Sequence, residues 1–280
     1  MNEDKPEQHQ IGKGMLGAGL TGQTAVVTGG GAVPGRGMGR AISLALAAAG
    51  VRVVAVDIDA GAAEDTVRAI AEAGGEALAV HADVGRREDI VRIGSEAEAR
   101  FGVVDILVNH VGIGNHLSLL DTTDDWWDRA LAVNLTAPFL TARQFLPGML
   151  AKGRGVIINT ISICGMVGGR AGAAYTASKH GLVGLTRNIA AAYSQQGIRC
   201  VGVAPGSVRS GEANWNSSEG RIADSADLSG IWPSLRQALE LSPRRGTPDE
   251  IAGAVVFLAS DHASFINGAV LPIDGGWTAI

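Results

Sequence analysis

The stretch that decides the fold runs from residue 24 to residue 39 and reads TAVVTGGGAVPGRGMG. Its first five residues form a short apolar run, typical of a strand that is buried on both faces of a sheet. Glycines end this run, and the alanine- and leucine-rich residues 40–49 that follow favour a helix, which stops at Gly50. A strand, a glycine-rich turn and a helix in this order predict the start of an α/β sheet with parallel strands.

The same alternation continues to the end of the chain. Further strands are expected at residues 51–56, 77–81, 105–108, 156–159, 199–203 and 269–273, and helices at 62–73, 87–100, 123–150, 173–195 and 248–260. The helix at 123–150 is expected to bend or break near Pro138 and Pro147. Seven strands separated by helices predict a Rossmann-type, doubly wound parallel sheet with helices on both faces, in a single domain over residues 21–280. Residues 1–20 read as a mobile N-terminal tail, and the segment 207–246 as an insertion that forms a substrate loop or lid.

The composition argues against several classes of protein. Hydrophobic residues make up 46% of the 280 residues and charged residues 18%, which is too apolar for a disordered chain. The net charge is −5 and no basic stripe is visible, so we expect no nucleic-acid partner. No apolar stretch reaches the ~18 residues of a membrane helix, and the polar start MNEDKPEQHQ does not resemble a signal peptide. Cys164 and Cys200 belong to no CxxC motif or Cys/His cluster, so we expect no disulfide, no metal site and a cytoplasmic location.

The glycine-rich turn after the first strand suits a dinucleotide. Glycines let the backbone approach a pyrophosphate, and the N-terminus of the following helix offers free N–H groups and partial positive charge. Asp57 ends the second strand about 20 residues later, where a carboxylate can hold the ribose hydroxyls of an adenosine. Asp57 could instead cap the following helix, but together with the turn it favours a dinucleotide site.

Tyr175 and Lys179 form a second candidate feature. Residues at i and i+4 share one face of a helix, so the phenol and the ammonium can project into one site. A free tyrosine has a pKa of ~10, and a cation ~4 Å away at an effective dielectric of ~20 stabilises the phenolate by ~4 kcal/mol, or about three pKa units. Lys179 could thus make Tyr175 a usable acid/base. The same spacing is also common on ordinary helix surfaces.

Further motifs occur in one order along the chain. These are Thr28-Gly29 with Gly37-Met38-Gly39, His81-Ala82-Asp83-Val84, Val133-Asn134-Leu135, Ser162 thirteen residues before Tyr175, Pro205-Gly206, and LPIDGG at 271–276. With this set, residues 22–277 resemble a short-chain dehydrogenase/reductase (SDR) of the ordinary-length, single-domain kind.

The resemblance implies four catalytic roles. Tyr175 would be the general acid/base for the substrate hydroxyl, and Ser162 would hydrogen-bond the substrate oxygen. Lys179 would bind the nicotinamide ribose and lower the pKa of the tyrosine. Asn134 would place a water in the proton path from Lys179 to solvent.

The resemblance also implies the binding residues. Cofactor contacts are expected from residues at or near the strand ends, namely Gly29, Arg36, Gly37, Met38, Gly39, Asp57, Asp83, Val84, Asn109, Gly112, Tyr175, Lys179, Pro205, Gly206, Val208 and Ser210. Substrate contacts are expected from Ser162, Cys164, Tyr175 and Trp215. Trp215 lies in the expected lid and could serve equally to anchor the lid to the body of the protein.

Three positions depart from the family pattern. Gly29 and Gly37 enclose seven residues, four more than the family's usual glycine spacing. His110 replaces the second asparagine of the family's Asn-Asn-Ala-Gly, and we expect it to hydrogen-bond locally rather than to catalyse. Ser210 stands where the family usually has threonine and keeps the hydroxyl.

Asp57 and Arg36 bear on the choice of cofactor. Asp57 would repel a ribose 2′-phosphate and so favours NAD, whereas Arg36 lies where NADP enzymes of the family often carry a basic residue. We therefore expect an NAD-dependent oxidoreductase that interconverts a secondary alcohol and a ketone, as a homotetramer or homodimer. An NADP-dependent ketoreductase, including the 3-oxoacyl-thioester type, and a nucleotide-binding protein without turnover are the alternatives.

Overall fold

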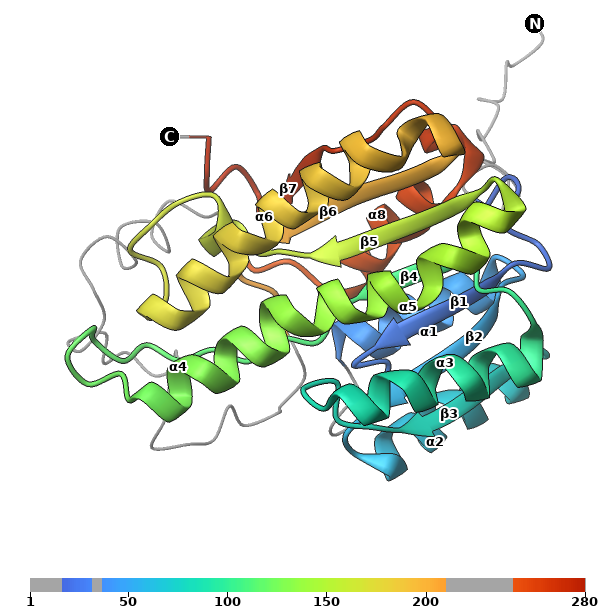
Figure 1. Ribbon diagram of the computed structural model, residues 1–280, viewed down its shortest axis with the longest axis horizontal. Helices are drawn as coiled ribbons and strands as arrows, with labels where there is room; N and C mark the ends of the chain where they lie inside the picture. Colours follow the sequence, from blue (N-terminus) through green and yellow to red (C-terminus); the bar gives the residue numbers. More distant parts are fainter. Residues whose placement is uncertain (1–16, 32–36, 210–243, 280) are drawn as a thin grey trace, which may run out of the picture.

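The computed structural model describes residues 17–31, 37–209 and 244–279. Within them it confirms the expected architecture, a seven-stranded parallel sheet in the order β3-β2-β1-β4-β5-β6-β7. Helices α3, α5 and α6 cover one face of this sheet, and α1, α2 and α8 cover the other (Figure 1). The order reverses between β1 and β4, which is where open sheets of this type bind ligands.

The expected strands and helices are all present, with small differences at their ends. The strands are β1 Thr24–Thr28, β2 Arg52–Asp57, β3 Ala77–His81, β4 Ile106–Asn109, β5 Gly155–Thr160, β6 Ile198–Pro205 and β7 Val270–Ile273. The helices are α1 Met38–Ala48, α2 Ala60–Glu72, α3 Arg87–Phe101, α4 Asp124–Leu131, α5 Ala137–Lys152, α6 Ala173–Tyr193 and α8 Pro248–Ala259.

The long helix expected at 123–150 differs in detail. It is divided by the π-helical turn η1, Ala132–Thr136, and α5 then begins with Pro138 in its first turn. α5 continues directly from the π-helical turn, where the hydrogen-bond pattern shifts, and Pro138, which has no N–H, follows this shift. Pro147 does not break the helix, which continues to Lys152. Burial of Phe145 and Met149 on the same helix offsets the lost backbone hydrogen bond.

The core lies on both faces of the central strands. Every residue of β1, β4 and β5 is buried, as expected for strands covered by helices on both sides. Leu20, at the end of the expected N-terminal tail, is also fully buried and packs into the core on the α1 side. Residues 17–20 are therefore part of the folded domain, and the rest of the expected tail lies outside the described residues.

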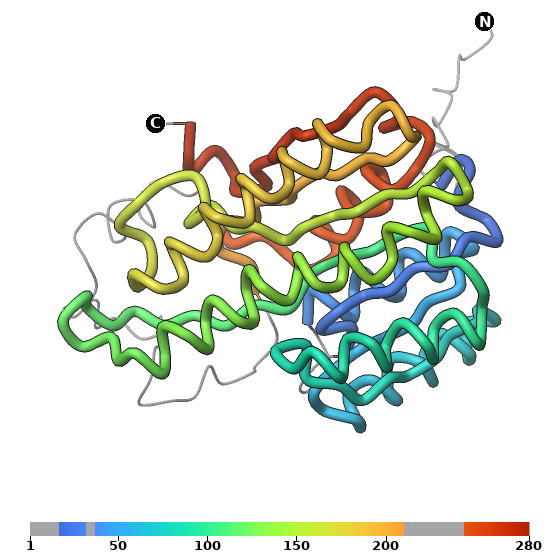
Figure 2. Tube along the Cα trace, viewed as in Figure 1, coloured from blue at the N-terminus to red at the C-terminus, as the bar shows by residue number. Residues whose placement is uncertain are grey.

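The loops that leave the carboxyl ends of β4 and β5 extend from the same end of the sheet (Figure 2). They carry residues 110–123 and 161–172, and α6 starts directly after the second of them. The sheet therefore places the sequence motifs after β4, after β5 and on α6 beside one another.

Candidate active site

Ser162, Tyr175 and Lys179 come together at the carboxyl end of β5. A side-chain hydrogen bond joins the Ser162 hydroxyl and the Tyr175 phenol. The Lys179 ammonium lies 5.6 Å from the centre of the Tyr175 ring and donates a hydrogen bond to the Thr160 carbonyl, at 2.8 Å. Residues 160 and 162 come from the end of β5, whereas 175 and 179 lie on one face of α6. A hydroxyl, a phenol and an ammonium in this arrangement can bind the oxygen of a substrate and transfer one proton.

Ser162 has an unusual backbone conformation. Among the described residues it is the one non-glycine residue with a positive φ, 123°, and its ψ is 155°. This region is almost confined to glycine, and a side chain there costs of order 1–3 kcal/mol. Its hydroxyl also accepts a hydrogen bond from the Cys164 N–H, at 3.2 Å. The strained backbone thus directs the hydroxyl toward Tyr175.

Burial dominates the electrostatics of Tyr175 and Lys179. Burial raises the pKa of Tyr175, the Cys164 thiol adds to this, and the hydrogen bond from Ser162 lowers it. Lys179 is 2% exposed, and burial lowers its pKa to about 8. Burial is the largest effect on the pKa of Tyr175, and the implied lowering of that pKa by Lys179 stays a prediction.

Asn134 lies in the π-helical turn and links two segments of the site through hydrogen bonds. Its side-chain oxygen accepts the Ile113 N–H at 2.9 Å, and its amide donates to the Ile113 carbonyl at 2.8 Å and to the Ser178 hydroxyl at 3.0 Å. The side chain is fully buried. It therefore fixes the loop after β4 against α6, and its implied role in placing a water stays a prediction.

Two glycines in the loop after β4 let its backbone approach the reactive groups closely. A Cβ on Gly112 would lie 3.1 Å from the Lys179 ammonium, and one on Gly114 would lie 2.6 Å from the Tyr175 ring. Any larger side chain at these positions would displace the lysine or the tyrosine. The backbone of this loop thus packs directly against both side chains.

The glycine-rich turn lies at the carboxyl end of β1 beside Asp57. One carboxylate oxygen of Asp57 accepts the Gly31 N–H at 3.1 Å, and the other accepts the Asp59 N–H at 3.1 Å. Asp59, not Asp57, caps α2 by accepting the Ala62 N–H. The alternative role considered for Asp57 therefore belongs to its neighbour, and Asp57 supports the glycine turn.

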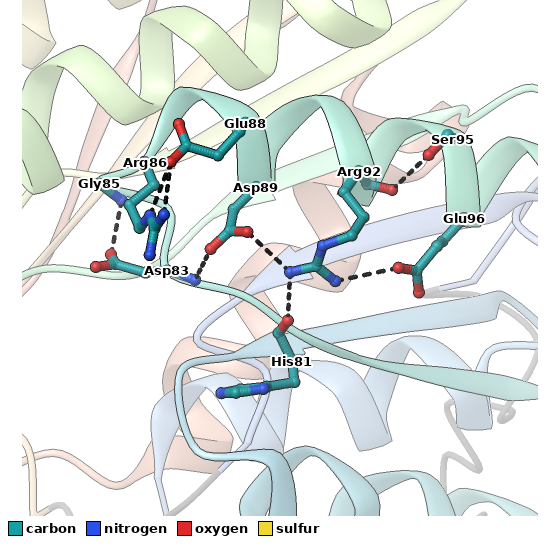
Figure 3. Close-up of polar contacts among 9 residues, drawn as sticks. All are labelled: His81, Asp83, Gly85, Arg86, Glu88, Asp89, Arg92, Ser95 and Glu96. Atoms are coloured by element: carbon teal, nitrogen blue, oxygen red, sulfur yellow. Dashed lines mark hydrogen bonds and ion pairs between the residues drawn. The ribbon is translucent and has the colours of Figure 1, made fainter.

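The far end of the site lies at β3 and α3 (Figure 3). The Asp83 carboxylate accepts the Gly85 N–H at 2.8 Å. Asp89 on α3 accepts the Asp83 N–H at 2.9 Å, and Arg92 donates to the His81 carbonyl at 2.7 Å and to Asp89 at 2.9 Å. The first turns of α3 thus hold the backbone of residues 81–83 in place.

Arg129 of α4 completes this end of the site. Its guanidinium pairs with the Asp83 carboxylate at 2.9 Å, from an element distant in sequence. A Cβ on Gly85 would collide with that guanidinium, so Gly85 makes room for the pair. Sequence reasoning missed Asp89, Arg92 and Arg129. The Asp89–Arg92 spacing of i, i+3 on a predicted helix was a usable signal for the first two.

These features fit a bound dinucleotide. Gly37 precedes α1 and has no side chain to cap it, so the first N–H groups of α1 can face an anion. No acidic residue lies in the first turn of α1. Asp57 ends β2 and Asp83 follows β3 on one side, and Lys179 and Tyr175 lie beside β5 on the other. The carboxylates suit ribose and base, and the helix terminus suits a phosphate.

Comparison with known proteins assigns the chain to a family. Residues 31–278 match the model of a family described as enoyl-(acyl carrier protein) reductase, within the short-chain dehydrogenases/reductases. The chain belongs to the SDR family. Its named relatives are dehydrogenases, and this SDR is an NAD(P)-dependent oxidoreductase that acts on alcohols or ketones.

Three relatives illustrate how varied the substrates named for similar proteins are. The SDR is 38% identical to 3beta-hydroxysteroid dehydrogenase 2 of Eggerthella lenta, over 93% of this chain and 96% of that protein. It is 39% identical to 2-(S)-hydroxypropyl-CoM dehydrogenase 3 of Xanthobacter autotrophicus, over 93% and 98%. A solved structure from Beutenbergia cavernae, described as a putative NAD(P) dependent gluconate 5-dehydrogenase with bound NADP at low occupancy, has a TM-score of 0.82 and 38% identity, over 95% and 100%.

Two of the expected SDR cofactor contacts direct their side chains into the core. Asn109 donates to Asn159 at 2.9 Å and accepts from Thr141 at 2.7 Å, and it is 3% exposed. Val84 is 5% exposed and packs in the core on the α3 side. A contact of either residue with the cofactor would therefore come from its backbone, and both contacts stay predictions. Asn109 ends a strand whose side chains alternate between two buried faces, and tertiary packing decides which face receives the amide.

Of the remaining residues expected at the cofactor or the substrate, some lie in the described part of the chain and some lie outside it. Gly206 follows Pro205 at the end of β6, where a Cβ would lie 2.8 Å from Asp274, and Val208 forms a bridge with Gly246. Arg36, Ser210 and Trp215 lie outside the described residues, as does most of the expected lid.

Cys164 lies beside the reactive groups as a packing residue. It is 7% exposed, clusters with Ile163, Ala171 and Trp277, and burial raises the pKa of its thiol. A thiol with a raised pKa is a poor nucleophile. The expected contact of Cys164 with the substrate stays a prediction.

In the described part of the chain, no group of three or more His, Cys, Asp or Glu side chains could hold a metal ion. No helix within the described residues has the length and apolar character needed to cross a membrane.

Proposed function

We propose that the protein is an NAD-dependent dehydrogenase that interconverts a secondary alcohol and a ketone, with Tyr175 as the general acid/base. The observation that carries the proposal is the hydrogen bond between Ser162 and Tyr175, with the Lys179 ammonium 5.6 Å from the phenol ring. A protein that only binds a nucleotide has no need of this set of groups. The names of the relatives support the substrate class, because they refer to a 3beta-hydroxysteroid, a 2-hydroxypropyl group and gluconate.

The proposed chemistry divides between cofactor and protein. A bound nicotinamide would supply the hydride chemistry, and the chain's own groups orient the substrate and move one proton. Ser162 donates a hydrogen bond to the substrate oxygen. In ketone reduction Tyr175 donates its phenolic proton to that oxygen, and in alcohol oxidation it accepts the proton. Lys179, held by the Thr160 carbonyl, supplies the positive charge that stabilises the phenolate.

The preference for NAD rests on Asp57. Its carboxylate is held at the end of β2 by two backbone N–H groups, and it would repel a 2′-phosphate. An NADP-dependent ketoreductase is the second candidate, favoured by the NADP in the Beutenbergia cavernae structure. Arg36 bears on this choice and lies outside the described residues.

Initial rates test the proposal. The purified protein is assayed with NAD and with NADP against secondary alcohols from small aliphatic alcohols to polyols and hydroxysteroids. We expect turnover with NAD, and we expect Asp57→Ser to shift the kcat/KM ratio toward NADP at least tenfold. Turnover of the wild type with NADP alone would replace the NAD assignment with the second candidate. Nucleotide binding without turnover of any alcohol would contradict the enzymatic proposal.

A further inference from the structure

His110 occupies the first position after β4, between the glycine-rich turn and the catalytic lysine. Its backbone N–H donates to the Thr28 hydroxyl at 3.0 Å, and its imidazole Nδ1 lies 3.3 Å from the Thr160 hydroxyl. These partners end β1 and β5, the strands on either side of β4. His110 therefore connects three adjacent strand ends.

On one side the imidazole packs against the base of the glycine turn. A Cβ on Gly29 would lie 3.3 Å from the imidazole Cδ2, and a Cβ on Gly39 would lie 2.9 Å from it. Gly29 stands before the lengthened part of the turn, and Gly39 stands after it. The edge of the ring thus contacts the backbone where the turn begins and where it ends.

On the other side the imidazole reaches the lysine through one residue. The Thr160 hydroxyl faces His110, while the Thr160 carbonyl accepts the Lys179 ammonium at 2.8 Å. Burial and the nearby charge of Lys179 lower the pKa of His110 to about 4. The ring is therefore neutral at pH 7 and has one N–H donor and one acceptor nitrogen.

We propose that His110 is a positioning residue that braces both ends of the glycine turn and, through Thr160, sets the place of Lys179. The inference rests on the proposed function. It assigns a role to His110, one of the three positions at which this chain departs from the family pattern. One imidazole then influences two quantities that are measured separately, the affinity for the cofactor and the rate of the chemical step.

The experiment compares single and double variants. His110→Ala removes both contacts of the ring, and His110→Asn keeps a side-chain donor and acceptor. Thr160→Val removes the hydroxyl but keeps the carbonyl that binds Lys179. The matched control is His180→Ala, because His180 is exposed on α6 and bonds only the Thr176 carbonyl of its own helix among the described contacts. Each protein is characterised by the Kd for NADH from fluorescence titration, by kcat and KM, and by its melting temperature.

We expect His110→Ala to raise the Kd for NADH about tenfold and to lower kcat about tenfold. Thr160→Val should lower kcat similarly but leave the Kd within about twofold of wild type, because the glycine side of the ring stays in place. The double variant should have the kcat of the His110→Ala protein, since both changes break one connection. His110→Asn should recover most of the loss, and His180→Ala should match wild type.

Several outcomes would overturn the proposal. One is a His110→Ala protein with wild-type Kd and kcat. Another is an equal impairment of His110→Ala and His110→Asn with an equal loss of melting temperature, which would indicate a merely structural role. A third is full additivity of the two kcat effects in the double variant. If the wild type binds NADH but turns over no alcohol, the proposed function fails, and the change in Kd still decides whether His110 braces the turn.

Discussion

At the scale of single residues, the backbone conformation of Ser162 lowers the stability of the folded protein by a measurable amount. Its φ of 123° favours glycine, so Ser162→Gly and Ser162→Ala should differ although both lose the hydroxyl. We expect both variants to lose activity and the glycine variant to be more stable by about 1 kcal/mol, since relief of strain exceeds the added entropy of the unfolded chain. Urea unfolding measures the difference. The control is Ser95, which is exposed within α3, and there the alanine variant should be more stable than the glycine variant. If Ser162→Ala is as stable as Ser162→Gly, the backbone at position 162 is not strained.

Lys179 gives a pH dependence of stability. Its pKa of about 8 lies below the ordinary 10.5, so between these values the unfolded chain binds a proton that the folded protein has lost. The free energy of unfolding therefore rises with pH through this window, and the cost of the buried charge is present in full below pH 8. The difference corresponds to about 3 kcal/mol.

Lys179→Met tests the free-energy cost of the buried Lys179 charge. Removal of the charge should stabilise the protein at pH 7 by less than the full amount, because the Thr160 carbonyl loses its partner. The gain over wild type should shrink as the pH rises from 8 to 10.5, and activity should be lost. Urea unfolding at several pH values measures the gain. A difference between the two proteins that does not change with pH would contradict the buried charge.

At the scale of elements, α3 positions one end of the proposed cofactor site (Figure 3). Asp89→Ala removes the acceptor for the Asp83 N–H and a partner of Arg92. We expect the Kd for NADH to rise about threefold to tenfold with kcat nearly unchanged, because α3 lies away from Tyr175. Fluorescence titration and initial rates measure the two quantities. Glu88→Ala, which removes an exposed pair with Arg86, is the control and should have no effect. A fall in kcat without a change in Kd would contradict this role.

The sequence predicted the elements well where the signal is local. Apolar runs of about five residues marked the strands, and α6 carries Tyr175 and Lys179 on one face as the i, i+4 spacing required. The π-helical turn at 132–136 was not predictable in this way. It accompanies Asn134, whose side chain pairs with Ile113 twenty-one residues earlier in the chain. The inward direction of Asn109 and the pairing of Asp83 with Arg129 likewise depend on contacts between distant segments.

At the scale of the whole molecule, exposed apolar side chains support the expected homo-oligomer. Phe265 and Leu271 lie in the C-terminal part of the chain and are 103% and 40% exposed, and Phe139 on α5 is 44% exposed. Exposed apolar surface of this kind favours association. Light scattering should give a mass of two or four chains, and Phe265→Asp should reduce it. A wild-type protein with the mass of one chain would contradict the prediction.

We propose that Tyr175 transfers the proton at a site assembled by the ends of β4 and β5 and by α6. A comparison of Tyr175→Phe with wild type in alcohol oxidation and in NADH binding tests this role directly. We expect a fall in kcat of about 10²–10⁴-fold with a Kd for NADH within about threefold of wild type. A variant that oxidises the alcohol at the wild-type rate would contradict it.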